Sequence, residues 1–79
     1  MARRSGNKSV RGPHVAKALG TWNDLNEIIT ELTHDEVMVA LFRESEGRRR
    51  VGTIRRLIQR AAHITEQRVK EELTRRYLS

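Results

Sequence analysis

Residues 32–37 read Leu-Thr-His-Asp-Glu-Val, and this stretch decides the expected fold. Thr33 and Glu36 form a capping box, in which the Thr33 hydroxyl accepts the amide of Glu36 and the Glu36 side chain reaches back to the start of the helix. Leu32 stands before the cap and Val37 stands four residues into the helix, which is the arrangement of a hydrophobic staple. The sequence therefore predicts a sharp corner between two helices.

One helix is expected on each side of this corner. Before it, Thr21 and Asp24 form a capping pair, and apolar residues at helical spacing predict a helix over 22–32, with Trp22 as a core anchor. After it, a helix over 34–46 is expected to end at Gly47 in a left-handed exit. The apolar residues that this helix should bury are Val37, Met38, Leu41 and Phe42.

A third and longer helix is expected over 50–77. Its predicted core stripe spans an arc of about 120°, with Leu57 and Ile64 on the flank. The stripe consists of Val51, Ile54, Ile58, Ala61, Ala62, Val69 and Leu73. In the second half, acids precede bases by four residues in three pairs, so this half can hold helical form with little packing. This half can project from the domain or pair with a second copy of the chain.

The N-terminal segment differs in composition from the rest. Residues 1–13 have few large apolar side chains and cannot offset their ordering entropy, so we expect a disordered basic arm. A short helical turn is expected over His14–Leu19, after Pro13. The predicted organisation is a 1–13 arm followed by a single 14–79 domain, all-α, with three helices over 22–32, 34–46 and 50–77.

Composition excludes several classes of protein. The chain has 79 residues and no cysteine, which rules out cysteine zinc sites, disulfide scaffolds and thiol redox sites. The longest apolar run is Val37–Phe42, too short for the ~20 residues that span a bilayer, and the first residues lack the pattern of a secretory signal. We expect no membrane partner and a location in the cytoplasm or in a virion.

Charge alternates along the chain in blocks. Residues 1–20 carry five Lys and Arg and no acid, residues 21–46 carry seven acids against one Arg, and residues 47–65 carry six Arg and no acid. The net charge of +6 therefore conceals strong local fields, which act on partners more than on the fold.

The six arginines of the third block are the main functional signal, because guanidinium groups match phosphate geometry. The predicted nucleic-acid-binding residues are Arg48, Arg49, Arg50, Arg55, Arg56 and Arg60, with Arg3, Arg4, Lys8 and Arg11 of the arm. DNA and RNA both remain open as partners. The third helix can begin anywhere in 49–53, and the latest of these starts leaves six residues, 47–52, before it, which exceeds the usual helix-turn-helix connection. The alternative is internal charge balance with the acidic block or an acidic protein partner.

A second hypothesis is a protein-interaction module that binds a host or virion protein or forms a homodimer through the C-terminal helix. Its candidate residues are Asp24, Glu27 and Glu31 on an acidic face, and Val69, Leu73 and Tyr77 on a projecting edge. We expect no catalytic residues and no cofactor, since no nucleophile and base pair or phosphate loop is visible. The three histidines are far apart, so no metal site is expected.

The layout Ala18-Leu19-Gly20, Trp22-Asn23-Asp24-Leu25, Leu32-Thr33-His34-Asp35-Glu36 and Gly47-Arg48-Arg49-Arg50 resembles that of small helical accessory proteins of tailed bacteriophages. The resemblance covers residues 18–60 and contains no family-specific motif, so it transfers no functional residue. It implies that the protein binds nucleic acid, blocks a host machine or joins the virion.

Overall fold

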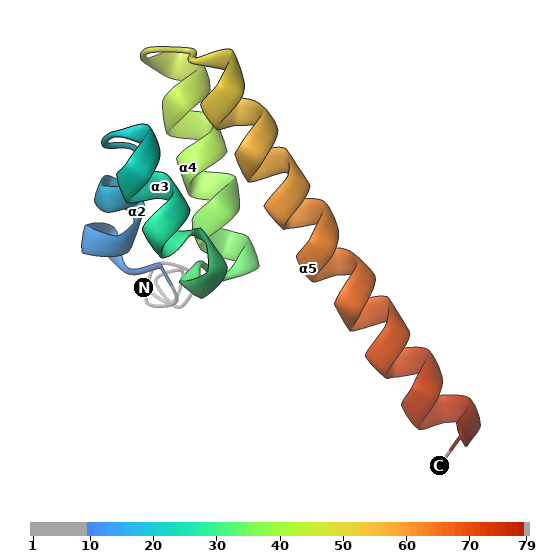
Figure 1. Ribbon diagram of the computed structural model, residues 1–79. Helices are drawn as coiled ribbons and strands as arrows, with labels where there is room; N and C mark the ends of the chain where they lie inside the picture. The colour runs from blue at the N-terminus through green and yellow to red at the C-terminus, as the bar shows by residue number, and fades with distance from the viewer. Residues whose placement is uncertain (1–9, 79) are drawn as a thin grey trace, which may run out of the picture.

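The computed structural model describes residues 10–78, which form an all-α fold (Figure 1). The helices are α2 (Gly12–Ala18), α3 (Trp22–Ile28), α4 (His34–Glu46) and α5 (Val51–Leu78), with a 3₁₀ turn, η1 (Ile29–Glu31), after α3. The all-α class and the long C-terminal helix are confirmed. Where the sequence predicted only a short helical turn, α2 adds a helix to the three expected.

Both capping boxes are present. At the start of α3, Thr21 Oγ1 accepts the Asp24 N–H at 3.0 Å and Asp24 Oδ2 accepts the Thr21 N–H at 3.3 Å. At the start of α4, Thr33 Oγ1 accepts the Glu36 N–H at 3.2 Å and Glu36 Oε1 accepts the Thr33 N–H at 2.9 Å. Local side-chain bonds thus set both helix starts, as the sequence indicated.

The core forms where α2, α3 with η1, α4 and the first half of α5 meet. Leu32 and Val37, the two residues of the predicted staple, both lie in it. The buried apolar residues are Val15, Ala18, Leu25, Ile28, Ile29, Leu32, Val37, Ala40 and Leu57. Only Leu57 comes from α5, so most of the core is built before the long helix begins.

The predicted boundary of the arm at residue 13 is wrong for residues 10–13. Val10 packs against the core, Arg11 is the N-cap of α2, and the helix begins at Gly12. Arg11 bonds the buried carboxylate of Glu36, 25 residues away in the sequence. This long-range contact offsets the entropy lost when residues 10–13 become ordered, and composition alone could not reveal it. Arg3, Arg4 and Lys8 lie outside the described residues.

Several side chains expected in the core are exposed. Trp22 is 51% exposed, Met38 47% and Phe42 66%. The buried side of α4 includes Glu36 and Glu44, because each of these acids has an arginine partner, and the helix is therefore rotated from the purely apolar expectation. Apolar periodicity could not detect a buried face that is partly ionic.

The predicted core stripe of α5 also faces differently. Leu57, placed on the flank by sequence, is fully buried, whereas Val51, Ile58 and Val69 are 60%, 52% and 53% exposed. Apolar residues cover more of the circumference of α5 than the side that packs on the domain. The centre of the predicted stripe is therefore exposed. From Thr65 to Leu78 every residue is exposed, and this half of α5 projects from the rest of the protein (Figure 1).

Candidate nucleic-acid interface

Arg50 links the connection between α4 and α5 to the turn after α2, and its side chain points into the protein. Its Nε and Nη2 donate to the two carboxylate oxygens of Glu44, both at 2.9 Å, and its guanidinium also donates to the carbonyls of Gly20 at 2.7 Å and Leu19 at 2.8 Å. These bonds use four of the five guanidinium N–H groups. Arg50 therefore satisfies the carbonyls of the C-cap residue of α2 and of the residue after it, and its expected phosphate contact is replaced by a structural role.

Glu44 is buried, with 2% of its side chain exposed. Hydrogen bonding from the Arg50 side chain lowers the pKa of the Glu44 carboxyl, although burial acts in the opposite direction. The same bond raises the pKa of Arg50. The pair is thus charged in the folded protein, and it fixes the connection between α4 and α5.

Arg11 has an equivalent role at the other end of α4. Its Nε donates to Glu36 Oε2 at 2.7 Å and its Nη2 donates to Glu36 Oε1 at 2.9 Å and to the Glu31 carbonyl at 2.8 Å. The Arg11 side chain is the main reason that the pKa of Glu36 falls from 4.5 to about 2. Like Arg50, this arginine is held within the domain and does not extend as part of a free arm.

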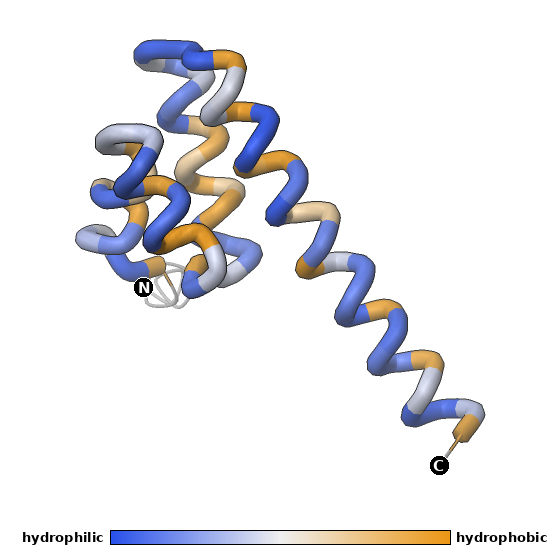
Figure 2. The backbone as a smooth tube through the Cα atoms, viewed as in Figure 1, coloured by the Kyte–Doolittle hydropathy of each residue, from blue (hydrophilic) through white to orange (hydrophobic). Residues whose placement is uncertain are grey.

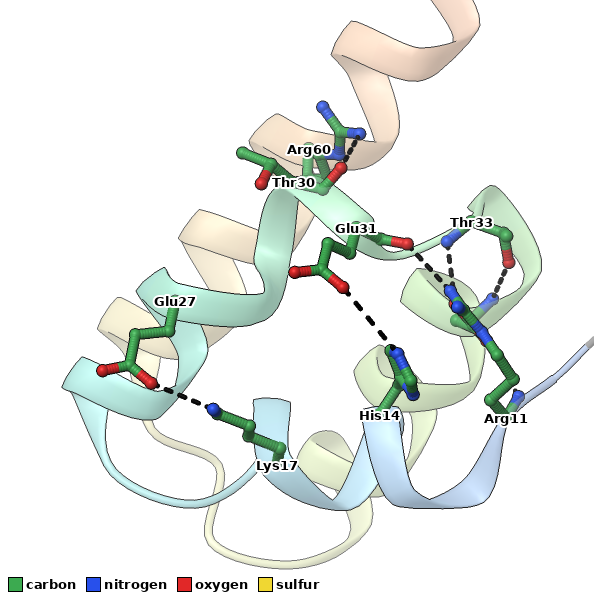
Figure 3. Close-up of polar contacts among 9 residues, drawn as sticks. Arg11, His14, Lys17, Glu27, Thr30, Glu31, Thr33 and Arg60 are labelled. Atoms are coloured by element: carbon green, nitrogen blue, oxygen red, sulfur yellow. Dashed lines mark hydrogen bonds and ion pairs between the residues drawn. The ribbon is translucent and has the colours of Figure 1, made fainter.

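The acids of α3 and η1 face α2 (Figure 3). Lys17 Nζ lies 2.9 Å from Glu27 Oε1, and His14 Nε2 lies 3.9 Å from Glu31 Oε1. The hydrogen bond to Glu27 is the largest cause of a raised pKa at Lys17. Asp24 is engaged in the capping box. The acidic surface proposed for protein contact is therefore partly occupied by the protein's own side chains.

Arg56 and Arg60 of α5 contact α3 and η1 on the side of this segment that faces away from α2. Arg56 Nε donates to Asn26 Oδ1 at 3.0 Å, and Arg60 Nη2 donates to the Thr30 carbonyl at 2.9 Å (Figure 3 shows the latter). Both acceptors are neutral oxygens, so the bonds orient the two guanidinium groups without neutralising them. The Nε of Arg60 is buried and has no hydrogen-bond partner.

The two arginines line a shallow pocket of about 260 Å³ between η1 and α5. Its lining residues are Ile29, Thr30, Arg56, Gln59, Arg60 and His63. Arg56, Arg60 and His63 share one face of α5 by helical spacing alone, whereas Asn26 and Thr30 come from the segment of α3 and η1 and carry no sequence signal that links them to α5. The pocket brings together groups that donate hydrogen bonds to anions.

Trp22 lies at one end of this basic face. Its carbonyl accepts a bond from Asn26 Nδ2 at 2.9 Å, and Asn26 in turn holds Arg56. The indole lies over Gly52, at 3.8 Å from the position that a Cβ would take there. The sequence interpreted Trp22 as a core anchor, but its half-exposed ring stands beside the arginines of α5.

The remaining arginines of the cluster stand near the connection between α4 and α5. This connection spans residues 47–50, shorter than the six residues expected, so the length objection to a helix-turn-helix is wrong. Arg49, not Gly47, adopts positive φ, at 53°, and donates to the Ser45 carbonyl at 3.2 Å. Within residues 10–78, Arg48 and Arg55 donate no hydrogen bond to the chain.

Other kinds of site were sought in the part of the chain that the structure describes. It contains no group of three or more metal-ligating side chains, and none of its helices is long and apolar enough to cross a membrane. Comparison of the chain with protein-family models, curated proteins and solved structures finds no match.

Proposed function

We propose that the protein binds nucleic acid through the face of α5 that carries Arg56, Gln59, Arg60 and His63. One observation carries the proposal. The acids of the neighbouring segment pair with bases of α2, Glu27 with Lys17 and Glu31 with His14, while Arg56 and Arg60 donate only to neutral oxygens of Asn26 and Thr30. A positive surface is thus separated from an acidic one within a single small domain.

The expected ligand group is a phosphate. Two guanidinium groups one helical turn apart, each already oriented by a bond to the protein, lose less side-chain entropy on binding than free arginines. The Nε of Arg60 is buried without a partner, so one donor of this guanidinium is not used by the protein itself. Arg48, Arg49 and Arg55 add positive charge near the helix start, where contacts to phosphates contribute through counterion release.

Trp22 extends this surface with an aromatic ring on which a base can stack. Base stacking on an aromatic side chain contributes about 1–3 kcal/mol and requires an unpaired base. The arrangement therefore favours a single-stranded or looped ligand over a regular duplex.

The first test is fluorescence anisotropy with a labelled single strand and a labelled duplex, measured over a series of salt concentrations. The double variant Arg56→Gln/Arg60→Gln should bind at least tenfold more weakly, and its salt slope should fall by about two. The control Arg43→Gln/Arg68→Gln removes the same charge from exposed positions elsewhere and should change affinity much less. Absence of binding at low salt, or binding that is insensitive to salt, would overturn the proposal.

Trp22 provides an independent measurement because it is the only tryptophan of the chain. Its fluorescence should be quenched on titration with a single strand, and Trp22→Leu should weaken single-strand binding more than duplex binding. Equal weakening of both ligands would contradict a stacking role.

The second candidate function is a protein-interaction module, and the exposed apolar residues of α5 favour it. Val69 is 53% exposed, Leu73 47% and Tyr77 71%. A pull-down from nuclease-treated host lysate tests it, with Val69→Asp/Leu73→Asp as the comparison variant. Proteins retained by the native chain and lost by the variant would support a host or virion partner.

A further inference from the structure

An exposed apolar stripe runs along the outer side of α5. At 100° per residue its members fall within an arc of about 80° and extend for about 33 Å. They are Val51, Ile58, Ala62, Thr65, Val69 and Leu73. Figure 2 shows hydrophobic positions recurring along the whole length of this helix, including the half that projects from the domain.

The stripe is separate from the side of α5 that packs on the domain. Thr53 and Leu57 are buried there and Ile64 is half-buried, whereas the centre of the stripe lies about 120–160° away from these three residues around the helix. It borders α4 at a groove of about 560 Å³ lined by Leu41, Ile58, Ala61, Ala62, Thr65 and Glu66. The exposed side chains of Met38 and Phe42 on α4 enlarge the apolar surface of this α4–α5 layer.

The projecting half of α5 lacks intramolecular packing. Residues 65–78 are all exposed and span about 21 Å of helix. Isolated helices of this length are marginal in water, and the Glu72–Arg76 pair at 3.1 Å contributes only about 0.3–0.5 kcal/mol. A second apolar surface against this half would stabilise it.

The charges of α5 indicate what that surface is. Residues 51–65 contain three arginines and no acid, whereas residues 66–78 contain all three acids of the helix, Glu66, Glu71 and Glu72, together with four bases. Two copies of α5 packed in opposite directions would therefore place the acid-free half of each against the half of the other that holds the acids. Parallel packing would instead place the two acid-free halves together.

One antiparallel register pairs apolar positions and brings opposite charges near one another. Centred at position 60, it sets Val51 opposite Val69 of the second copy and Ile58 opposite Ala62. The same register sets Arg55 opposite Thr65, one residue from Glu66, and Arg55 and Glu66 stand at the same edge of the stripe, which is the edge that meets itself across a two-fold axis. Small side chains at the centre allow the two helices to approach closely.

We infer that the partner of this stripe is a second copy of the chain, packed antiparallel through α5 and bordered by α4. Arg56, Arg60 and His63 lie at least about 120° from the centre of the stripe, so the dimer leaves this part of the proposed nucleic-acid face uncovered while it engages Arg55. The dimer carries two such faces pointing away from each other. This inference does not depend on nucleic-acid binding.

Charge exchange at Arg55 and Glu66 tests both the dimer and its register. In sedimentation equilibrium of the full chain, Arg55→Glu and Glu66→Arg should each weaken association about tenfold or more, because each change places like charges together twice per dimer. The double variant restores opposite charges and should recover most of the affinity. Arg68→Glu, about 100° from the centre of the stripe, serves as the matched control and should have little effect.

Two outcomes would overturn the inference. One is a native chain that remains monomeric at several hundred micromolar. The other is a dimer that the single charge reversals leave unchanged, or that the double variant fails to restore. Circular dichroism of each variant verifies the fold, and Ile58→Asp/Val69→Asp should abolish association without loss of monomer helicity within the domain.

Discussion

Glu36 is the residue whose replacement tests the fold most directly. Its carboxylate is fully buried and accepts four hydrogen bonds, from the backbone and side chain of Arg11 and from the Thr33 amide. Glu36→Gln removes the charge and leaves only one oxygen to accept these bonds. The perturbation therefore acts on the start of α4 and on the anchoring of the N-terminal segment together.

The magnitude follows from proton linkage. The pKa of Glu36 is about 2 in the folded protein against 4.5 for the free group, and each unit corresponds to about 1.4 kcal/mol. Because the partner arginine is 45% exposed and water screens part of the interaction, we expect a net contribution of about 2 kcal/mol. The folded-state pKa is lowered, so this stability is present above pH 4.5 and is lost as the pH falls toward 2.

Thermal unfolding followed by circular dichroism measures this effect. At pH 7 the midpoint of Glu36→Gln should lie roughly 10 °C below that of the native chain, since about 1 kcal/mol corresponds to 4–8 °C in a domain of this size. The gap should close progressively between pH 5 and pH 2. Glu46→Gln makes the same chemical change at an exposed position and should leave the midpoint unchanged. A gap between native and Glu36→Gln chains that stays constant over this pH range would refute the reasoning.

Two further predictions concern the packing. Arg50→Lys keeps the charge but cannot reproduce the bidentate bond to Glu44 together with the two carbonyl bonds, so urea unfolding should show a loss of about 1–3 kcal/mol; an unchanged free energy would contradict the role of the fork. Leu57→Ala should cost about 2–5 kcal/mol because the side chain is fully buried, whereas Phe42→Ala, at a 66% exposed position, should cost far less. Measured below the concentration at which the chain associates, equal losses for these two variants would show that the burial of α4 and α5 is misassigned.

The helices and their starts could be predicted because they rest on local chemistry. Thr21 with Asp24 and Thr33 with Glu36 satisfy backbone groups three residues away, and such bonds need no knowledge of the rest of the fold. The length of α5 follows from its spacing and its acid-base pairs in the same way. The helical boundaries expected at 34–46 and 50–77 agree with the structure to within one residue.

The candidate site was predictable only in part. Helical spacing alone puts Arg56, Arg60 and His63 on one face, because this is a property of α5 by itself. That Arg56 would be held by Asn26 depends on how α5 crosses α3, and no local pattern encodes this crossing. The exposure of Trp22 beside these residues also depends on how α5 crosses α3.

The sequence by itself determined the all-α class, the capped corners and the alternation of basic and acidic blocks, because each depends on residues within a few positions of one another. The tertiary structure alone decided which charged side chains form ion pairs within the protein. Arg11 and Arg50 meet buried glutamates, while Arg56 and Arg60 meet neutral oxygens. The physical reason is that an ion pair depends on distance in space, and arginines that are equivalent in sequence become different once the helices pack.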